Sequence, residues 1–315
     1  MPRICVTSIS FSKNPILRAE LLEIFPDTVF NESGKKMSEL DVIEFAQGFD
    51  AVIVGTEPIS ARVIDALPGM QVLAKYGVGL DSIDLDYLKS AGRTLAWEPG
   101  VNRRSVAELA LGFMLSLVHN VHRTSLDLKR GIWTKEGGRL LSDRTVGIVG
   151  CGAIGQDLLT LLKPFGCELL ICDIEDKADV ARKFGAVQVP LNDLLEQSDI
   201  VTLHVPLTTM THHLVGPPQI DRMRDDSLLI NTSRGAVVDG DALKVALLAG
   251  LGLGPGKAIA GAALDVFESE PPGDLAFLAL PNLLGTPHIG GNALEAVLAM
   301  GRSAIAGLRK TFKSD

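Results

Sequence analysis

Short apolar runs alternate with longer amphipathic segments along most of this 315-residue chain. Runs of this kind, bounded by turn residues, are typical of parallel strands that helices cover on both faces. The sequence therefore predicts an α/β fold with doubly wound parallel sheets. The predicted strands are residues 1–6, 51–54, 72–74, 145–149, 168–172, 200–203, 228–230 and 258–266.

Two proline-containing segments, 98–102 and 281–287, interrupt this alternation. The first precedes residues 105–129, where apolar positions at spacings of three and four predict a long amphipathic helix. The second precedes residues 293–312, which predict a final helix. We therefore expect a continuous domain, 99–287, inserted into a second domain of residues 1–98 and 288–315. Ligands commonly bind in clefts at such domain crossings.

The charge and composition of the chain argue against several classes of partner. Lys and Arg number 30 against 38 Asp and Glu, a net charge of −8, and aromatic residues make up 5%. An acidic chain with few aromatic residues is not expected to bind nucleic acid or an anionic membrane surface. The longest apolar stretch, 109–118, is too short to cross a bilayer, and the N-terminus lacks a signal-peptide pattern. We expect a cytoplasmic protein.

The four cysteines, Cys5, Cys151, Cys167 and Cys172, lie in apolar runs, and no pair has the CxxC spacing. Zinc sites need clustered cysteine and histidine ligands. We therefore expect no bound metal, and we expect buried, reduced thiols of the kind usual in cytoplasmic proteins.

A glycine-rich turn follows the strand predicted at 145–149. Gly150, Gly152 and Gly155 fit the pattern G-x-G-x-x-G, a helical pattern follows them, and Asp173 ends the next strand. This arrangement binds the pyrophosphate of a dinucleotide at a helix N-terminus. Gly150 is expected to make the tight turn, Gly152 to admit the phosphates, and Gly155 to let the helix pack on the strand. Asp173 is expected to bind the ribose hydroxyls, which favours NAD over NADP.

Five further motifs follow a fixed order along the chain. They are Gly-Val-Gly-Leu-Asp at 77–81, Val-Ala-Glu at 106–108, Asn-Thr-Ser-Arg-Gly at 231–235, Ala-Leu-Asp-Val-Phe-Glu-Ser-Glu-Pro at 263–271 and Thr-Pro-His-Ile-Gly-Gly at 286–291. With the glycine-rich turn, they make the chain resemble the D-isomer-specific 2-hydroxyacid dehydrogenases over nearly its whole length. The resemblance implies a Rossmann NAD-binding domain, 99–287, inserted into a flavodoxin-like substrate domain. It also implies an oxidoreductase that transfers a hydride between NAD and C2 of a small D-2-hydroxy or 2-keto acid.

The resemblance assigns a catalytic role to three residues. Arg234 matches the arginine that binds the substrate carboxylate and polarises the keto oxygen, a role that suits a planar guanidinium group. His288 matches the general acid and base, since histidine can move a proton in either direction near neutral pH. Glu270 matches the carboxylate that orients His288 and favours its protonated form. Glu268 is also near, and only the family's spacing of five residues from Asp265 selects Glu270.

The resemblance also implies further contacts to cofactor and substrate. Asp265 is expected to meet the nicotinamide carboxamide. Val78 and Gly79 are expected to offer backbone N–H groups to the substrate carboxylate, and Asn102 to touch substrate or nicotinamide. The remaining cofactor contacts are expected at Ala153, Ile154, Val205, Thr232, Gly290 and Gly291.

The substrate of the chain stays open between two branches of the family, the hydroxypyruvate and glyoxylate reductases and the phosphoglycerate dehydrogenases. Gly55 stands where phosphoglycerate dehydrogenases often have a phosphate-binding arginine, which favours an unphosphorylated substrate, although Lys75 offers another cation. We expect no C-terminal regulatory domain of the kind that longer phosphoglycerate dehydrogenases have. Residues 250–256 are similar to an inserted, glycine-rich surface loop.

Three alternatives accompany this interpretation. An NAD-sensing, corepressor-like binding protein would share the fold and the same three residues but would reduce 2-keto acids poorly. An NAD-using hydrolase of the adenosylhomocysteinase kind would be a longer chain. The apolar helix at 105–129, with Trp133, is expected to form a homodimer interface by resemblance, whereas packing within its own domain is the simpler explanation.

Overall fold

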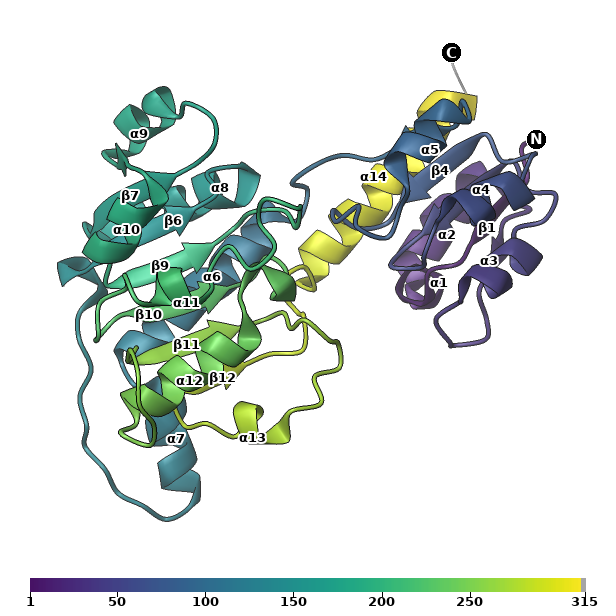
Figure 1. The fold of residues 1–315 in the computed structure, drawn as a ribbon. Helices are drawn as coiled ribbons and strands as arrows, with labels where there is room; N and C mark the ends of the chain where they lie inside the picture. The colour runs from purple at the N-terminus through teal and green to yellow at the C-terminus, as the bar shows by residue number, and fades with distance from the viewer. Residues whose placement is uncertain (313–315) are drawn as a thin grey trace. The chain divides into compact units, whose positions relative to one another are not determined.

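The computed structural model describes residues 1–312, which divide into two compact units. One unit contains Met1–Asn102 and the segment that starts at Gly291, and the other contains Arg103–Gly290. The boundaries expected from the sequence, after residues 98 and 287, lie slightly earlier. In Figure 1 the first unit is purple and blue with a yellow α14, and the second runs from blue through teal and green to yellow-green.

The first unit is built on a five-stranded sheet in the order β2-β1-β3-β4-β5, and all its strand pairs are parallel. Alternate residues along each strand point to opposite faces, and both faces are apolar. Ile4 and Ile53 belong to the core under α2 and α14, whereas Cys5 and Val52 belong to the core under α3, α4 and α5. The elements of this unit are β1 (Ile4–Val6), α1 (Ile9–Lys13), α2 (Pro15–Ile24), β2 (Val29–Phe30), α3 (Glu39–Phe45), β3 (Ala51–Val54), α4 (Ala61–Ala66), β4 (Val72–Lys75), α5 (Leu85–Ser90), β5 (Thr94–Ala96) and α14 (Leu294–Phe312).

The second unit is built on a seven-stranded parallel sheet in the order β12-β11-β10-β9-β6-β7-β8. The predicted class, doubly wound parallel α/β, is confirmed in both units. The elements of this unit are α6 (Arg103–Val118), α7 (Val121–Lys129), β6 (Thr145–Val149), α8 (Ala153–Leu162), β7 (Glu168–Cys172), α9 (Ala178–Phe184), β8 (Val187–Gln188), α10 (Leu191–Gln197), β9 (Ile200–Leu203), α11 (Pro217–Ile220), β10 (Leu228–Asn231), α12 (Gly240–Gly250), β11 (Gly261–Leu264), α13 (Leu275–Leu278) and β12 (Leu283–Gly285), with 3₁₀ turns at 141–143, 163–165 and 235–237.

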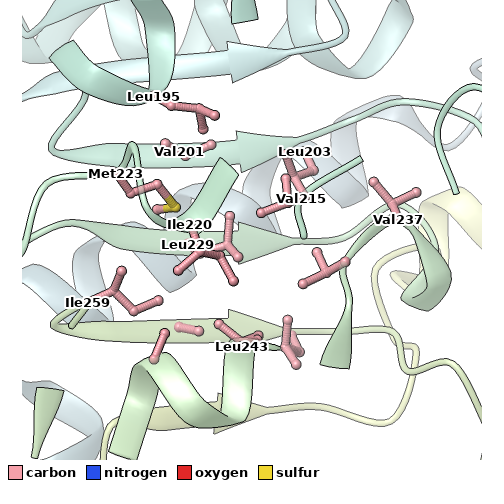
Figure 2. Packing of buried hydrophobic residues seen from close by; sticks show 14 of the residues in the cluster. Leu195, Val201, Leu203, Val215, Ile220, Met223, Leu229, Val237, Leu243 and Ile259 are labelled. Atoms are coloured by element: carbon pink, nitrogen blue, oxygen red, sulfur yellow. The ribbon is translucent and has the colours of Figure 1, made fainter. Parts of the chain in front are cut away.

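Helices cover both faces of the seven-stranded sheet. On one face, Ile148 and Ile200 pack with residues of α6 and α8. On the other face, Val201 and Leu229 pack with Leu243 of α12 and with residues of α10 and α11, as Figure 2 shows. The two cores fix the strands, so the loops that leave the carboxyl ends of the strands start from a rigid base.

The carboxyl ends of the central strands of this sheet lie in one row. In the pairing register, Val149 is opposite both Cys172 and Leu203, and Asn231 is opposite both Leu203 and Leu264. The residues that follow these strands therefore emerge side by side. Ligands of open α/β sheets bind at this edge, at the point where the order of the strands reverses. In this sheet, β7 and β8 lie on one side of β6 and β9 to β12 on the other, so that point is between β6 and β9.

Three local features differ from the sequence-based expectations. The helix expected at 105–129 is divided into α6 and α7, because Asn120 adopts the left-handed conformation with φ of 55°. Asparagine tolerates that conformation better than most residues. The helix expected to follow Gly155 begins earlier, at Ala153, and the strand expected at 258–266 contains only Gly261–Leu264. Among the helices within residues 1–312, none combines the length and the apolar composition that spanning a bilayer requires.

Candidate active site

The glycine-rich turn has the geometry that a dinucleotide requires. Gly150 has a φ of 92°, and a Cβ atom there would lie 2.6 Å from the carbonyl oxygen of His204. A Cβ on Gly155 would lie 2.3 Å from the carbonyl oxygen of Gly150, so the helix can approach the turn only with glycine at 155. A Cβ on Gly152 would meet nothing within 4 Å. The turn is therefore tightly packed against the rest of the protein at Gly150 and Gly155, and it is open at Gly152.

The N-terminus of α8 begins directly at this open position. Gly152 is the N-cap residue, and no side chain caps the first turn of the helix. Uncapped N–H groups and the helix dipole favour an anion at this point. Ala153 is exposed and Ile154 partly exposed there, as expected for residues that border a ligand.

Asp173, at the end of β7, connects the glycine-rich turn to the next loop. Its Oδ2 accepts a hydrogen bond from the Cys151 N–H at 2.7 Å, and its Oδ1 accepts one from the Glu175 N–H at 3.0 Å. A carboxylate has about four acceptor positions, so both oxygens retain capacity for ribose hydroxyls. The carboxylate thus organises the turn as well as offering acceptors to a sugar.

A partly buried histidine, His204, directly follows β9. The Nε2 atom of His204 is 2.9 Å from the hydroxyl of Thr202, and its Nδ1 atom is 3.4 Å from the hydroxyl of Thr232. Burial lowers the pKa of His204 to about 4, so the ring is neutral near pH 7. The ring supports the loops that bear Val205 and Thr232, and it is not placed to move protons at physiological pH.

The loop after β10 holds Arg234 in a tightly bonded turn. The Asn231 side chain accepts hydrogen bonds from the Ser233 N–H at 3.0 Å and hydroxyl at 2.7 Å, and it donates to the carbonyl of Arg234 at 2.8 Å. The Nη1 atom of Arg234 donates to the Ser233 carbonyl at 2.6 Å. A Cβ on Gly235 would overlap the backbone of Phe267, so this turn packs directly on the segment that bears Glu270.

Asp265 is buried and shapes the segment that bears His288. Its Oδ1 accepts from the Thr286 hydroxyl at 2.6 Å and the Ile289 N–H at 2.8 Å, and its Oδ2 accepts from the Gly290 N–H at 2.7 Å. Its carbonyl accepts from the His288 N–H at 2.8 Å. Asp265 therefore positions the histidine segment, a role that the sequence analysis did not foresee. The predicted contact to nicotinamide would use the acceptor capacity that remains.

His288 and Glu270 form a directly bonded pair. The Nδ1 atom of His288 is 2.8 Å from Oε2 of Glu270, and the Glu270 Oε1 accepts from the Phe267 N–H at 3.2 Å. His288 adopts a φ of 55°, which is unusual for a residue other than glycine, and the bond to Asp265 helps to hold it there. With Nδ1 directed at Glu270, the proton to be exchanged with a substrate belongs on Nε2.

Glu268, the other carboxylate near this pair, is engaged elsewhere. Its Oε1 accepts from the Gly240 N–H at 3.0 Å, and its Oε2 lies 3.4 Å from Nε2 of His213. Glu268 and Glu270 lie two residues apart in the sequence, but each contacts a different histidine, His213 and His288 respectively. Of these two carboxylates, Glu270 is the one bonded to His288.

Comparison with known proteins identifies the family. The model of the D-isomer specific 2-hydroxyacid dehydrogenase NAD-binding domain matches residues 111–290, more than half of the chain. The chain belongs to the D-isomer-specific 2-hydroxyacid dehydrogenases. It is 34% identical over 289 residues to hydroxypyruvate reductase of Thermotoga maritima, covering 90% of this chain and 87% of that one.

Two further comparisons concern a longer relative and a solved structure. It is 33% identical over 304 residues, 95% of its length, to D-3-phosphoglycerate dehydrogenase of Methanocaldococcus jannaschii, but it spans only 56% of that protein. The crystal structure of D-lactate dehydrogenase from Aquifex aeolicus, complexed with NAD and lactic acid, has a TM-score of 0.85 and 25% identity, with coverage of 99% and 95%. The predicted family, the NAD cofactor and the class, an NAD-dependent oxidoreductase of 2-hydroxyacids, are confirmed.

The residues of this dehydrogenase fit the cofactor that its family uses. Glycines at 150 and 155 are required by close backbone contacts, Gly152 opens onto an uncapped helix N-terminus, and Asp173 offers acceptors at the ribose position. Lys177 lies beside this carboxylate, and hydrogen bonding to Glu175, together with the charge of Asp173, raises the pKa of its ammonium group. Two carboxylates, those of Asp173 and Glu175, surround this one ammonium group, and their net negative charge disfavours a 2′-phosphate.

The remaining predicted residues of the dehydrogenase lie in the first unit. Val78 and Gly79 are partly exposed in the turn after β4, where the Val78 carbonyl accepts from the Trp97 indole N–H at 3.0 Å. Asn102 lies against Gly291, because its Nδ2 would be 3.0 Å from a Cβ there, and its Oδ1 is buried without a hydrogen-bond partner. Their substrate and cofactor contacts stay predictions.

One supporting residue escaped the sequence analysis. Thr286 holds Asp265 through its hydroxyl, two positions before His288. In the sequence, Thr286 is visible only as a polar residue before Pro287 in the histidine motif. Its partner, Asp265, is 21 positions away, so the fold is needed to bring the two together.

Proposed function

We propose that this dehydrogenase catalyses reversible hydride transfer at C2 of short 2-keto and D-2-hydroxy acids, with His288 as acid and base and Arg234 as carboxylate ligand. One observation supports this most strongly: the His288–Glu270 pair, bonded at 2.8 Å, is held by Asp265 at the same sheet edge as the glycine-rich turn. When bound, the nicotinamide cofactor supplies or accepts the hydride.

Each residue acts through a definite atom. The Nε2 atom of His288 donates a proton to the keto oxygen during reduction and takes it back during oxidation. Glu270 binds Nδ1, which orients the ring and stabilises the cation that forms. The Arg234 guanidinium group binds the carboxylate in a planar pair of hydrogen bonds and polarises the keto oxygen. The unit Arg103–Gly290 binds NAD, and the other unit binds substrate through Val78 and Gly79.

A panel of substrates tests this function. Purified protein is mixed with NADH and glyoxylate, pyruvate, hydroxypyruvate, phenylpyruvate, 2-oxoglutarate or 3-phosphohydroxypyruvate, and absorbance at 340 nm follows oxidation of NADH. We expect turnover with at least one short acid, and formation of the D-hydroxy product on a chiral column. Tight binding of NADH without turnover of any acid would contradict the proposal and favour an NAD-sensing protein.

Glu270→Gln tests the proton path, because it keeps the shape of the side chain and removes its charge. Reduction needs protonated His288, and the carboxylate stabilises that cation. We therefore expect the alkaline limb of kcat/KM for reduction to move to lower pH, an effect that added salt weakens because both side chains are partly exposed. In oxidation the neutral ring is the base, so activity is expected to persist to lower pH.

Glu268→Gln is the matched control for this profile. It removes an equivalent charge two residues away, next to His213 and not His288. Both pH limbs are expected to stay in place in this variant. Limbs that move in Glu268→Gln but not in Glu270→Gln would remove Glu270 from the proton path.

Asp173→Ser tests the choice of cofactor. The variant loses acceptors for the ribose hydroxyls and also releases the Cys151 and Glu175 N–H groups. We expect NADH to bind about tenfold or more weakly. The ratio of NADPH to NADH affinity should rise, because Lys177 then faces a 2′-phosphate with one fewer acidic neighbour. Fluorescence titration with both cofactors measures this, with Asp179→Ser, an exposed acid on α9, as the control. Equal affinities of the wild type for NADH and NADPH would contradict the role of Asp173.

We further propose a cytoplasmic homodimer that pairs through α7 and the loop after it. All nine residues of α7 have surface exposure, and apolar side chains concentrate on this segment, with Trp133 76% and Leu128 58% exposed. Exposed apolar clusters of this kind favour association. The four cysteines are free thiols, which supports a reducing compartment.

Leu128→Glu combined with Trp133→Ser is expected to convert the dimer to a monomer, measured as halved mass by light scattering. Both substitutions remove exposed apolar area, so the fold should survive them. Leu275→Glu, at a leucine on α13 that is 74% exposed, is the control and should leave the mass unchanged. A wild type that is monomeric at micromolar concentration would refute the dimer.

A further inference from the structure

Two charged side chains are buried at the carboxyl edge of the five-stranded sheet. Glu57 is 2% exposed and Lys75, the last residue of β4, is 4% exposed. Charged groups are rarely buried to this extent, because leaving water is costly unless hydrogen bonds compensate. The sheet below them is covered by apolar cores on both faces, so packing alone does not call for charge here.

Both side chains bond to the backbone of one residue, Gly55. The Gly55 N–H donates to Oε2 of Glu57 at 2.5 Å, and the Lys75 ammonium group donates to the Gly55 carbonyl. Ser8 closes the same corner, since a Cβ on Gly55 would lie 2.8 Å from its hydroxyl oxygen. A hydrogen-bond donor and an acceptor are therefore fixed on either side of a glycine that cannot accept a side chain without movement.

This corner is also where the topology places a ligand. The strand order β2-β1-β3-β4-β5 reverses between β1 and β3, and ligands of such sheets bind outside the carboxyl ends of the strands at that point. Ser8 lies in the segment after β1, which Figure 1 labels, and Gly55 directly follows β3. Lys75 leads into the turn that contains Val78 and Gly79, and its Cε would lie 3.5 Å from a Cβ on Gly77.

We propose that Glu57 and Lys75 form the subsite for the C3 substituent of the substrate and select a hydroxyl group there. This inference rests on the proposed function, because it assumes that Val78 and Gly79 bind the carboxylate of a 2-keto acid. The substrates selected are short 2-keto acids with a hydroxyl on C3, of which hydroxypyruvate is the smallest.

The donor–acceptor pair explains this selection. A hydroxyl group can accept a hydrogen bond from the Lys75 ammonium group, which carries three N–H donors, and can donate one to the carboxylate of Glu57. A methyl group in the same place forms no hydrogen bond with either charged side chain. Sites built to bind a hydroxyl group strongly reject analogues that lack it. A phosphoryl group brings two negative charges next to Glu57, which repels it.

The wild-type protein provides the first test. We expect kcat/KM for hydroxypyruvate to exceed that for pyruvate and for 3-phosphohydroxypyruvate by about a hundredfold or more. Turnover of pyruvate as efficient as that of hydroxypyruvate overturns this inference and leaves the proposed function intact. Failure to turn over any 2-keto acid overturns the proposed function itself.

Two variants separate selection from structural support. Lys75→Met retains length and volume without charge, and we expect the ratio of hydroxypyruvate to pyruvate efficiency to fall about tenfold or more. Glu57→Gln should raise the relative efficiency with 3-phosphohydroxypyruvate. Lys89→Met, which removes an exposed charge from α5, is the control and should change no ratio. If Lys75 only holds the Gly55 turn, the methionine variant lowers the efficiency with glyoxylate, pyruvate and hydroxypyruvate alike, and the inference is wrong.

Discussion

Replacing Arg234 with lysine is expected to lower kcat/KM for 2-keto acid reduction by about a hundredfold or more. Lysine keeps the positive charge but has no planar pair of donors to match a carboxylate. The backbone cannot compensate, because Asn231 bonds both sides of the turn and Gly235 packs against the backbone of Phe267. The ammonium group therefore binds the substrate as a point charge, without fixing the plane of the keto acid.

Steady-state kinetics with NADH in excess measure this loss, and a fluorescence titration measures NADH affinity separately. We expect kcat to fall and KM to rise while the affinity for NADH stays within about twofold, since Arg234 is assigned to the substrate. Arg222→Lys is the control, because Arg222 forms a surface ion pair with Glu196 in the same unit. Kinetics of Arg234→Lys within threefold of the wild type would remove Arg234 from the substrate site.

The elements that the sequence predicted well are those with a strong local signal. The strands at 51–54 and 200–203 were predicted at their observed bounds, because buried parallel strands are continuous apolar runs ended by turn residues. The glycine-rich turn was equally visible, since close backbone contacts leave glycine as the only residue that fits at 150 and 155. Such features depend on neighbours within a few positions, so one sequence suffices to find them.

Features that depend on distant partners were not predicted. The edge strands β2 and β8 have two residues each, and they are strands only because a longer neighbour pairs with them. The division of the long helix at Asn120 left the apolar spacing nearly unchanged, so the pattern could not reveal it. For the edge strands, the deciding interaction lies outside the window in which a hydrophobic period is visible.

The choice between Glu268 and Glu270 shows the same limit at the site. Both carboxylates are close to His288 in motif order, and the sequence offered only a family spacing to separate them. The structure supplies the physical reason, since Glu268 caps the N-terminus of α12 through Gly240 and lies against His213, while Glu270 faces His288. Asp265, Glu268 and Glu270 lie in the loop after β11, and His288 lies in the loop after β12, so the fold and not the local sequence decides which acid meets the histidine.

His288→Asn is expected to lower kcat in both directions by a factor on the order of 10² to 10⁴, the contribution of a positioned general acid and base. Asparagine tolerates the left-handed backbone that position 288 adopts, so the segment held by Asp265 should persist. The variant still binds the carboxylate through Arg234, and NADH affinity should be retained. The variant loses the group that donates a proton in the reduction and accepts it in the oxidation.

His213→Asn is a closely matched control for this loss. His213 also has a positive φ, 50°, and also lies beside a glutamate, Glu268 at 3.4 Å. If the chemistry depends on where a histidine lies and not on having an acid–histidine pair in this unit, kcat of His213→Asn stays within about threefold of the wild type. In His288→Asn the residual rate should also lose the alkaline limb of the reduction profile, because no imidazolium remains to be deprotonated. A residual rate that keeps that limb, or an equal loss in His213→Asn, would place the proton donor elsewhere.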